Sequence, residues 1–144
     1  MAQGNPAGAK ADGIGASLPR REDAALLTGR ARFIDDIDLP GQLHGYFVRS
    51  PHGHARIRAI DDAPALAVPG VVAVLTGRDM KADGVGLMQA PATPKGRKGE
   101  PIHNPPQLAL TADKARHVGD AVALVLAETP LAAREGAAAV AVDY

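Results

Sequence analysis

Apolar residues in this chain gather in short runs that are separated by turn-forming residues. Residues 43–49 hold a Tyr-Phe-Val group and residues 56–60 alternate charged with apolar side chains, so each segment predicts a strand. Residues 71–75 and 121–127 are continuously apolar, which is typical of strands covered on both faces. Residues 140–144 begin a further predicted strand. The pattern therefore predicts strands in both halves of the chain.

A short helix is predicted after the second of these strands. Asp61 or Asp62 can cap its start, because a carboxylate accepts hydrogen bonds from the free N–H groups of a first helical turn. Pro64 falls in that turn, where its missing N–H is harmless. The helix is expected to extend through Leu66 and to end at Pro69-Gly70.

Two further helix starts carry capping signals. Thr76 and Asp79 have the spacing of a capping box, which predicts one turn of helix. Thr129 followed by Pro130 is a strong start signal, and the helix that follows is expected to run to about residue 139. Gly136 lies inside this helix, where a missing side chain permits close approach to a sheet.

Both halves thus contain a strand–helix–strand order, which predicts an α/β fold class, more closely a single α+β domain with a mixed sheet. We expect residues 1–17, rich in Gly and Ala, to be a flexible lead-in and residues 18–144 to form the domain. Residues 81–107 contain five Pro and four Gly and show no helical or strand period. They predict a long exposed loop between the two halves.

The composition limits the classes of function. The 144 residues suit one domain, and with 46% hydrophobic but only 3% aromatic residues its core must be built from Val, Leu, Ile and Ala. The 16 basic and 16 acidic residues cancel, so neither nucleic acid nor a membrane surface is an expected partner. Without cysteine the chain forms no disulfide or Cys-ligated cluster. With no signal-peptide pattern at its start, the expected location is the cytoplasm.

His52 and His54 are the best candidates for metal ligands, because their spacing puts both on one face of an extended segment. Asp35, Asp36 or His44 could supply a third ligand. A turn with one hydrogen-bonded imidazole is the stronger interpretation, since two histidines rarely form a metal site alone. We therefore assign no metal-binding residue.

Two charged clusters have similar alternatives. Asp35, Asp36 and Asp38 could act as paired acid–base carboxylates, although aspartates before Pro-Gly more often serve in turns and caps. The basic residues Lys95, Arg97 and Lys98 could bind an anionic partner, although such a run is more often a solvated loop. No dinucleotide or phosphate-loop motif is complete, and no catalytic or cofactor-binding residue is predicted.

Several segments, taken in order, resemble the start of the molybdenum-bearing large subunit of the aldehyde oxidase, xanthine dehydrogenase and aerobic carbon monoxide dehydrogenase family. This part of the family's large subunit is known as the a/b hammerhead domain. The resemblance covers residues 13–144, and residues 47–57 carry its most specific motif. The matching segments are Ile14-Gly15-Ala16-Ser17, Arg21-Glu22-Asp23, Leu27-Thr28-Gly29-Arg30-Ala31, Phe33-Ile34-Asp35-Asp36, Phe47-Val48-Arg49-Ser50-Pro51-His52-Gly53-His54-Ala55-Arg56-Ile57, Pro69-Gly70-Val71-Val72-Ala73-Val74-Leu75-Thr76-Gly77, Val118-Gly119-Asp120-Ala121-Val122-Ala123 and Ala141-Val142-Asp143-Tyr144.

The resemblance implies that the domain is a non-catalytic, structural part, either a fragment or a split subunit, of a molybdenum hydroxylase that acts on aldehydes, N-heterocycles or carbon monoxide. The molybdenum–pterin cofactor and the catalytic base would belong to the cofactor-binding part of the large subunit, and iron–sulfur clusters and FAD to partner subunits or segments. One departure is Gly119-Asp120-Ala121-Val122, where the family usually has Gly-Glu-Pro-Val or Gly-Glu-x-Val. It predicts a slightly different turn. The implied structural residues are Asp36, Arg49, Ser50, Pro51, His54, Arg56, Gly70 and Gly119.

Among these residues Arg49 is expected to make bidentate contacts to a carboxylate or to strand carbonyls, and to be the most damaging single position to change. Asp36 is expected to pair with an arginine, and His54 to make one buried hydrogen bond. Two alternatives to an enzyme part stay open: a stand-alone interaction module, and a small independent enzyme with its own metal at His52 and His54.

Overall fold

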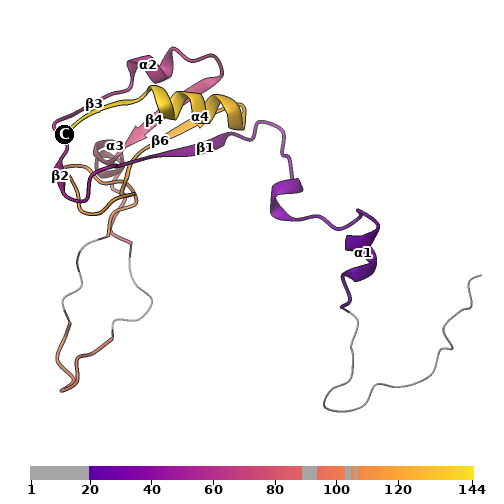
Figure 1. The fold of residues 1–144 in the computed structure, drawn as a ribbon, viewed down its shortest axis with the longest axis horizontal. Helices are drawn as coiled ribbons and strands as arrows, with labels where there is room; N and C mark the ends of the chain where they lie inside the picture. Colours follow the sequence, from indigo (N-terminus) through magenta and orange to yellow (C-terminus); the bar gives the residue numbers. More distant parts are fainter. Residues whose placement is uncertain (1–19, 89–93, 103–104, 106) are drawn as a thin grey trace, which may run out of the picture. The chain divides into compact units, whose positions relative to one another are not determined.

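The computed structural model describes residues 20–88, 94–102, 105 and 107–144 (Figure 1). The chain forms two compact units, residues 1–39 and residues 40–144. No helix in these described ranges is long and apolar enough to span a membrane. The first unit contains a short helix α1 (Asp23–Leu27) and a 3₁₀ turn η1 (Ile34–Asp36). The second unit contains the remaining elements.

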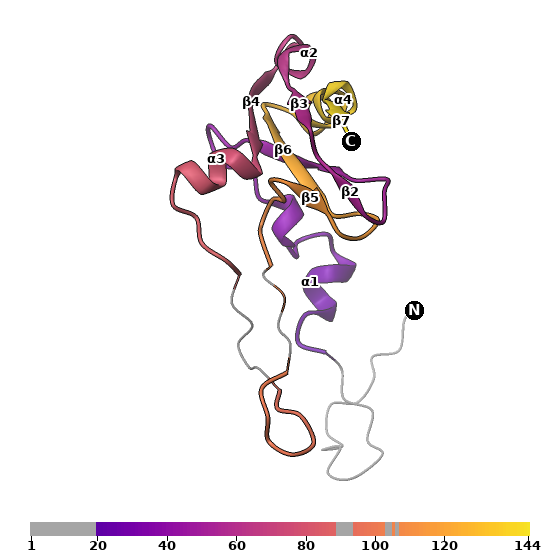
Figure 2. The same cartoon turned by 90° about the vertical axis from the view of Figure 1, so that its left-hand side faces the viewer.

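The central sheet of the second unit has the strand order β1 (His44–Arg49), β6 (Ala121–Ala127) and β4 (Val71–Thr76) (Figures 1 and 2). Both pairings are antiparallel, and Tyr46 and Val74 lie on either side of Val125. The register shifts once in each pairing: at Val122 of β6, opposite Val48 and Arg49, and at Val72 of β4. The most apolar strand therefore occupies the centre of the sheet, where both of its edges are paired.

Two small antiparallel pairs complete the strand pairings of the described residues. Strand β2 (Ala55–Arg56) pairs with β5 (Lys114–Ala115), and β3 (Ala59–Asp61) pairs with β7 (Ala141–Asp143). The single strand predicted over residues 56–60 is therefore wrong. The chain breaks there because Ile57 bonds to the Asp113 carbonyl whereas Arg58 bonds to the Asp143 carbonyl, so the backbone changes partner between them.

Helices α2 (Ala63–Leu66), α3 (Gly77–Ala82) and α4 (Pro130–Ala139) begin where the capping signals predicted. The Asp61 carboxylate accepts from the Ala63 amide at 3.1 Å, and the Thr129 hydroxyl accepts from the Ala132 amide at 3.1 Å. Two strand–helix–strand units result, β3–α2–β4 and β6–α4–β7. The two units pair with each other twice. Strand β4 of the first pairs with β6 of the second, and β3 of the first pairs with β7 of the second. The predicted fold class is confirmed.

The start of α3 is the capping box that the sequence predicted. The Asp79 carboxylate accepts from the Thr76 amide at 2.7 Å and from the Thr76 hydroxyl at 2.6 Å. These hydrogen bonds stabilise the charged carboxylate, the hydroxyl contributing most, and hold the pKa of Asp79 below its ordinary value.

The core of the second unit lies between β6 and helices α2 and α4, and it is built from small side chains. Val125, Ala127 and Ala133 are fully or almost fully buried. A Cβ at Gly136 would lie 2.7 Å from Val71 Cγ2 and 3.0 Å from Val125 Cγ1, so this glycine lets α4 approach the sheet as predicted. The expectation that residues 71–75 are covered on both faces is wrong, because Val72 is 52% exposed. Strand β4 borders the sheet, Val72 lies where its register with β6 shifts, and its other residues are only half-buried.

The described parts of residues 81–107 lie at the surface. After α3 the chain is extended, and the Met88 amide bonds to the Gln107 carbonyl at 2.9 Å, so the loop leaves and returns at neighbouring positions. Residues 94–102 form a tight turn in which Gly96 bonds to the Glu100 carbonyl and Lys95 bridges to Pro101. These contacts agree with the predicted exposed loop between the two halves of the chain.

Candidate functional site

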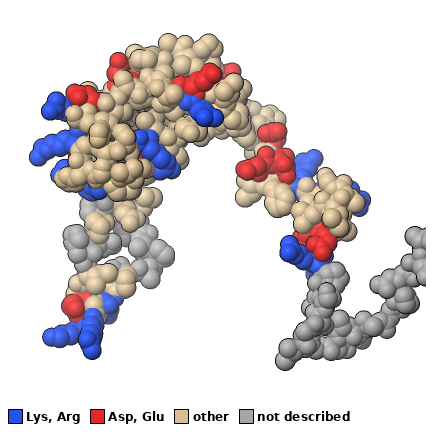
Figure 3. All heavy atoms as spheres, viewed as in Figure 1, with Lys and Arg blue, Asp and Glu red and all other residues tan. Residues whose placement is uncertain are grey.

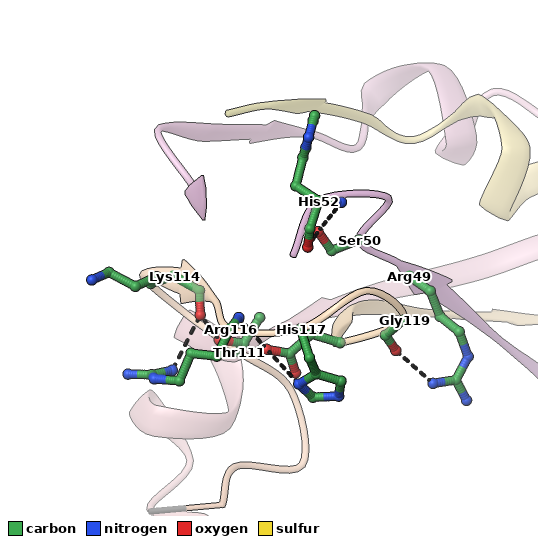
Figure 4. A network of polar contacts seen from close by, with 9 residues as sticks. Arg49, Ser50, His52, Thr111, Lys114, Arg116, His117 and Gly119 are labelled. Carbon is green, nitrogen blue, oxygen red and sulfur yellow. Dashed lines mark hydrogen bonds and ion pairs between the residues drawn. The ribbon is translucent and has the colours of Figure 1, made fainter. Parts of the chain in front are cut away.

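The most specific sequence motif and the Val118-Gly119-Asp120 motif meet at one place, which we call the Arg49–Gly119 junction (residues 49–52 and 116–121) (Figure 4). Arg49 Nη1 donates to the Gly119 carbonyl at 2.9 Å. The Ser50 amide donates to the Asp120 carbonyl at 2.9 Å, and the Gly119 amide donates to the Ser50 carbonyl at 2.8 Å. Beyond the register shift near Arg49, these bonds therefore hold the end of β1 against the turn that precedes β6.

Ser50 is the buried centre of the junction, with 2% of its surface exposed. Its hydroxyl donates to the His52 carbonyl and accepts from the His52 amide, both at 3.1 Å. This local bonding closes the turn that carries Pro51. The His52 ring then lies edge-on to the Tyr144 ring, with centroids 4.7 Å apart and planes at 69°.

The turn on the other side of the junction depends on Gly119 and Asp120. Gly119 has a φ of +88°, a conformation that side-chain-bearing residues rarely adopt. One carboxylate oxygen of Asp120 accepts from the Arg116 amide at 2.9 Å and lies 3.7 Å from Nδ1 of the exposed His117. Asp120, which stands where the family usually has a glutamate, is thus bonded within its own turn.

Two residues that were not predicted from the sequence, Thr111 and Gly77, lie at the backbone segment that bonds to Ala121 of the junction. Thr111 is buried, its amide donates to the Ala121 carbonyl at 2.7 Å, and its hydroxyl donates to the Lys114 carbonyl at 2.6 Å. A Cβ at Gly77 would lie 2.7 Å from backbone atoms of Thr111 and Ala112. Gly77 is therefore the position where the start of α3 meets the backbone of residues 111–112. A glycine directly after a capping threonine was the signal available in the sequence.

The other predicted structural residues are dispersed. Asp36 lies in the first unit, and its carboxylate accepts from the Phe33 amide at 2.9 Å, which is a cap and not the expected pair with an arginine. His54 is exposed and bonds to no other described residue, so the expected buried hydrogen bond is wrong. Arg56 pairs with Lys114 in the β2–β5 ladder. Gly70, with φ +84°, forms the turn after α2, and its carbonyl accepts from the Glu128 amide at 2.8 Å.

Arg49 also differs from its predicted role. Its guanidinium donates to one backbone carbonyl and lies 5.5 Å from the centre of the Phe47 ring, and the residue is exposed. A bidentate contact to a carboxylate is not present among the described residues. The position is thus a strand-end clamp with most of its donors facing solvent.

The junction lines a cavity of about 460 Å³ together with residues of the loop that precedes β5. Its polar side chains do not form a nucleophile–base pair, because the Ser50 and Thr111 hydroxyls both donate to backbone carbonyls. Within the described ranges no three His, Cys, Asp or Glu side chains gather as a metal site would require. We therefore assign no reaction step to these residues.

The basic residues 95, 97 and 98 are exposed on the turn of residues 94–102 (Figure 3). The Lys98 amide donates to a carboxylate oxygen of Glu100 at 2.8 Å, so the cluster includes one acidic side chain. This geometry agrees with a solvated turn.

The chain matches the family model "Aldehyde oxidase and xanthine dehydrogenase, a/b hammerhead domain" over residues 28–144. It is 42% identical over 122 residues to the nicotine 6-hydroxylase large subunit of Paenarthrobacter nicotinovorans. The aligned region covers 85% of this chain and 14% of that protein. It is 37% identical to the carbon monoxide dehydrogenase large chain of Afipia carboxidovorans, covering 94% of this chain and 15% of that protein. The chain therefore belongs to the a/b hammerhead domain family of aldehyde oxidase and xanthine dehydrogenase.

Solved structures show the same fold. The CO dehydrogenase of Oligotropha carboxidovorans superposes with a TM-score of 0.77 at 36% identity, over 93% of this chain and 15% of that chain. Quinoline 2-oxidoreductase of Pseudomonas putida 86 gives a TM-score of 0.75 at 40% identity, over 91% of this chain and 16% of that one. The chain thus spans about one seventh of the length of these relatives.

Proposed function

We propose that this chain is the non-catalytic structural domain of a molybdenum-dependent hydroxylase or dehydrogenase whose substrate is an aldehyde, an N-heterocycle or carbon monoxide. The relatives named as hydroxylase and dehydrogenase large subunits support the reaction class. The geometry around the junction supports the structural role, because the hydroxyls of Ser50 and of the neighbouring Thr111 both donate to backbone carbonyls.

The observation that carries the proposal is the exposed apolar surface of the first unit. Leu27 is 87% exposed, Ile34 86% and Phe33 65%, and no described residue of this unit is buried. Large apolar side chains left in water mark a surface that another part of the assembly covers. The cofactor-binding part of the large subunit is the proposed cover, and iron–sulfur and flavin subunits complete the proposed assembly.

The molybdenum–pterin cofactor belongs, in this proposal, to residues outside those described here. When bound, this group supplies two-electron oxidation coupled to transfer of oxygen from water. The residues of this chain contribute a rigid wall: the junction holds the end of β1, and the first unit supplies the contact surface.

The test is to tag the product of the native gene that contains these residues, purify it under gentle conditions, and measure metal content and subunit composition. Stoichiometric molybdenum in a complex that contains this sequence supports the proposal. A monodisperse chain with neither molybdenum nor a partner contradicts it and favours a stand-alone interaction module. A single bound zinc or iron that is lost in His54→Ala would instead support a small metal enzyme.

A further inference from the structure

The outer edge of β1 forms an open groove with α4. Strand β1 ends the three-stranded sheet, so only one of its edges pairs with another described strand (Figure 1). A cavity of about 570 Å³ lies at this strand, lined by the consecutive residues 45–49 and by Arg134, Ala137 and Ala138. Because successive side chains of a strand point to opposite faces, a hollow that touches consecutive residues follows the edge of the strand. The groove therefore exposes unpaired backbone groups.

Aromatic side chains flank this edge on both faces of the sheet. Tyr46 lies opposite Val125, which faces Gly136 of α4, so Tyr46 is on the helix side. Phe47 lies opposite Leu124 and is therefore on the other side. The two residues are 46% and 43% exposed. An added strand would cover part of both rings, and residues 44–48 contain none of the Lys or Pro residues that usually protect an edge strand.

The charge of the groove selects the kind of strand it accepts. Arg49 and Arg134 are its charged residues, and no carboxylate lines it. The Arg134 side chain makes no hydrogen bond or ion pair with any other described residue, and the Arg49 side chain uses one nitrogen on the Gly119 carbonyl. Both guanidinium groups therefore have donors free for a carboxylate.

We propose that the β1–α4 groove binds an extended, acidic peptide segment of a partner protein, which adds to β1 as a fourth strand and places a carboxylate against Arg134. Backbone hydrogen bonds to the edge supply affinity, the two rings supply apolar contact, and the arginines select acidic sequences. This interface does not depend on the proposed enzyme activity, because it rests only on the edge, the rings and the charges of this chain.

The test uses the 144-residue chain and three blocked peptides of about eight residues, the length of an ordinary strand. The first alternates Thr with Glu, the second has Gln in place of Glu, and the third is the acidic peptide N-methylated at alternate backbone positions. Fluorescence anisotropy measures affinity, and hydrogen exchange locates the contact. We expect the acidic peptide to bind with a Kd of about 1 mM or tighter, to slow amide exchange in residues 44–49, and to bind more tightly than the other two.

The variant Arg134→Gln is expected to weaken binding of the acidic peptide about two- to fivefold and to leave the Gln peptide unaffected. Arg134→Lys keeps the positive charge and should retain most of the affinity. Arg78→Gln, an exposed arginine on α3, is the matched control and should change nothing. Melting temperatures of all three variants show whether each remains folded.

Several outcomes would overturn the proposal. They are equal affinity for the acidic and Gln peptides, no loss on N-methylation, exchange protection outside residues 44–49, or no binding at about 1 mM. Dimerisation through β1, or strong protection in the free chain of the amides in residues 44–49 that do not bond to β6, would show that the chain fills its own groove and would also overturn it. Molybdenum content is not a readout here, so failure of this proposal is distinguishable from failure of the proposed function.

Discussion

The two units of this chain both contain large apolar side chains, but only the second unit buries them. In the first unit Leu27 and Ile34 are more than four-fifths exposed, whereas Val122 and Val125 in the second have no exposed surface. The hydrogen bonds of residues 20–37 join residues close in sequence, such as Arg30 with Ala25. The junction of the second unit instead joins Arg49 to Gly119, 70 positions away.

This difference shows that caps and turns shape a segment locally without giving it a core. Capping hydrogen bonds contribute little stability each, and a core requires apolar surfaces that come from distant parts of the chain. We therefore expect the stability of the isolated chain to reside in residues 40–144. The first unit should matter for assembly, and the following predictions test that division.

The largest expected effect is at Gly77, where the added Cβ of Gly77→Ala would meet backbone atoms of Thr111 and Ala112 at 2.7 Å. Backbone cannot rotate away as a side chain can, so we expect a loss of about 1–3 kcal/mol in the free energy of unfolding. Urea denaturation followed by circular dichroism measures it. Gly86→Ala is the control, because a Cβ there meets nothing within 4 Å. Equal stability of the two variants would contradict the close approach at Gly77.

A smaller effect is expected at Arg49. Arg49→Ala removes one hydrogen bond to the Gly119 carbonyl from an exposed side chain, so the expected loss is about 0.5–1.5 kcal/mol. The sequence alone predicted this position to be the most damaging. Thermal unfolding of Arg49→Ala and Gly77→Ala side by side decides the ranking, with Arg78→Ala as the surface control. An unchanged melting temperature in Arg49→Ala would show that the clamp does not stabilise the fold.

The capping box at Asp79 predicts a weak dependence of stability on pH. Because hydrogen bonds from Thr76 lower the pKa of Asp79 in the folded state, its contribution is fully present above the ordinary pKa and is lost as the pH falls through the lowered value. Asp79→Asn should cost about 0.3–1 kcal/mol at neutral pH. The difference from wild type should vanish in strong acid. Urea melts across this acidic range measure it, with Asp113→Asn as the control. A difference independent of pH would exclude this mechanism.

The smallest effect on the isolated chain is expected in the first unit. Ile34→Ser should change the free energy of unfolding by no more than about 0.5 kcal/mol, because Ile34 is 86% exposed. Val125→Ala, at a fully buried position, should cost about 1–3 kcal/mol. Co-purification of the tagged native product then measures assembly, which Ile34→Ser should weaken. If Ile34→Ser destabilised the isolated chain as much as Val125→Ala, the division between the two units would be wrong.

Much of the fold was predictable because its signals are local. Thr129 with Pro130, Thr76 with Asp79, and Asp61 mark helix starts through groups that bond within one turn. The two strand–helix–strand units and the role of Gly136 also agree with the structure. Each of these features depends on residues a few positions apart, or on an apolar run long enough to identify a strand.

The incorrect predictions concern partners that are distant in sequence. The break at Ile57 and Arg58 arises because two separate segments, near Asp113 and Asp143, supply the acceptors. Val72 is exposed at the point where the register between β4 and β6 shifts, in a strand at the border of the sheet. His54 lies in a turn that points to solvent, although the motif around it is the most specific in the sequence. Motif specificity identified the family but did not determine which side chain is buried.

The sequence by itself determined the family, the helix starts, the apolar strands and the absence of cysteine chemistry. Only the tertiary structure decided that Arg49 clamps Gly119, that Thr111 and Gly77 support the same place, and that β1 keeps a free edge beside Arg134. The physical reason is that capping and hydrophobic periodicity act within a turn or a strand. Hydrogen bonds across the fold and the order of strands in a sheet depend on which distant segments the packing brings together.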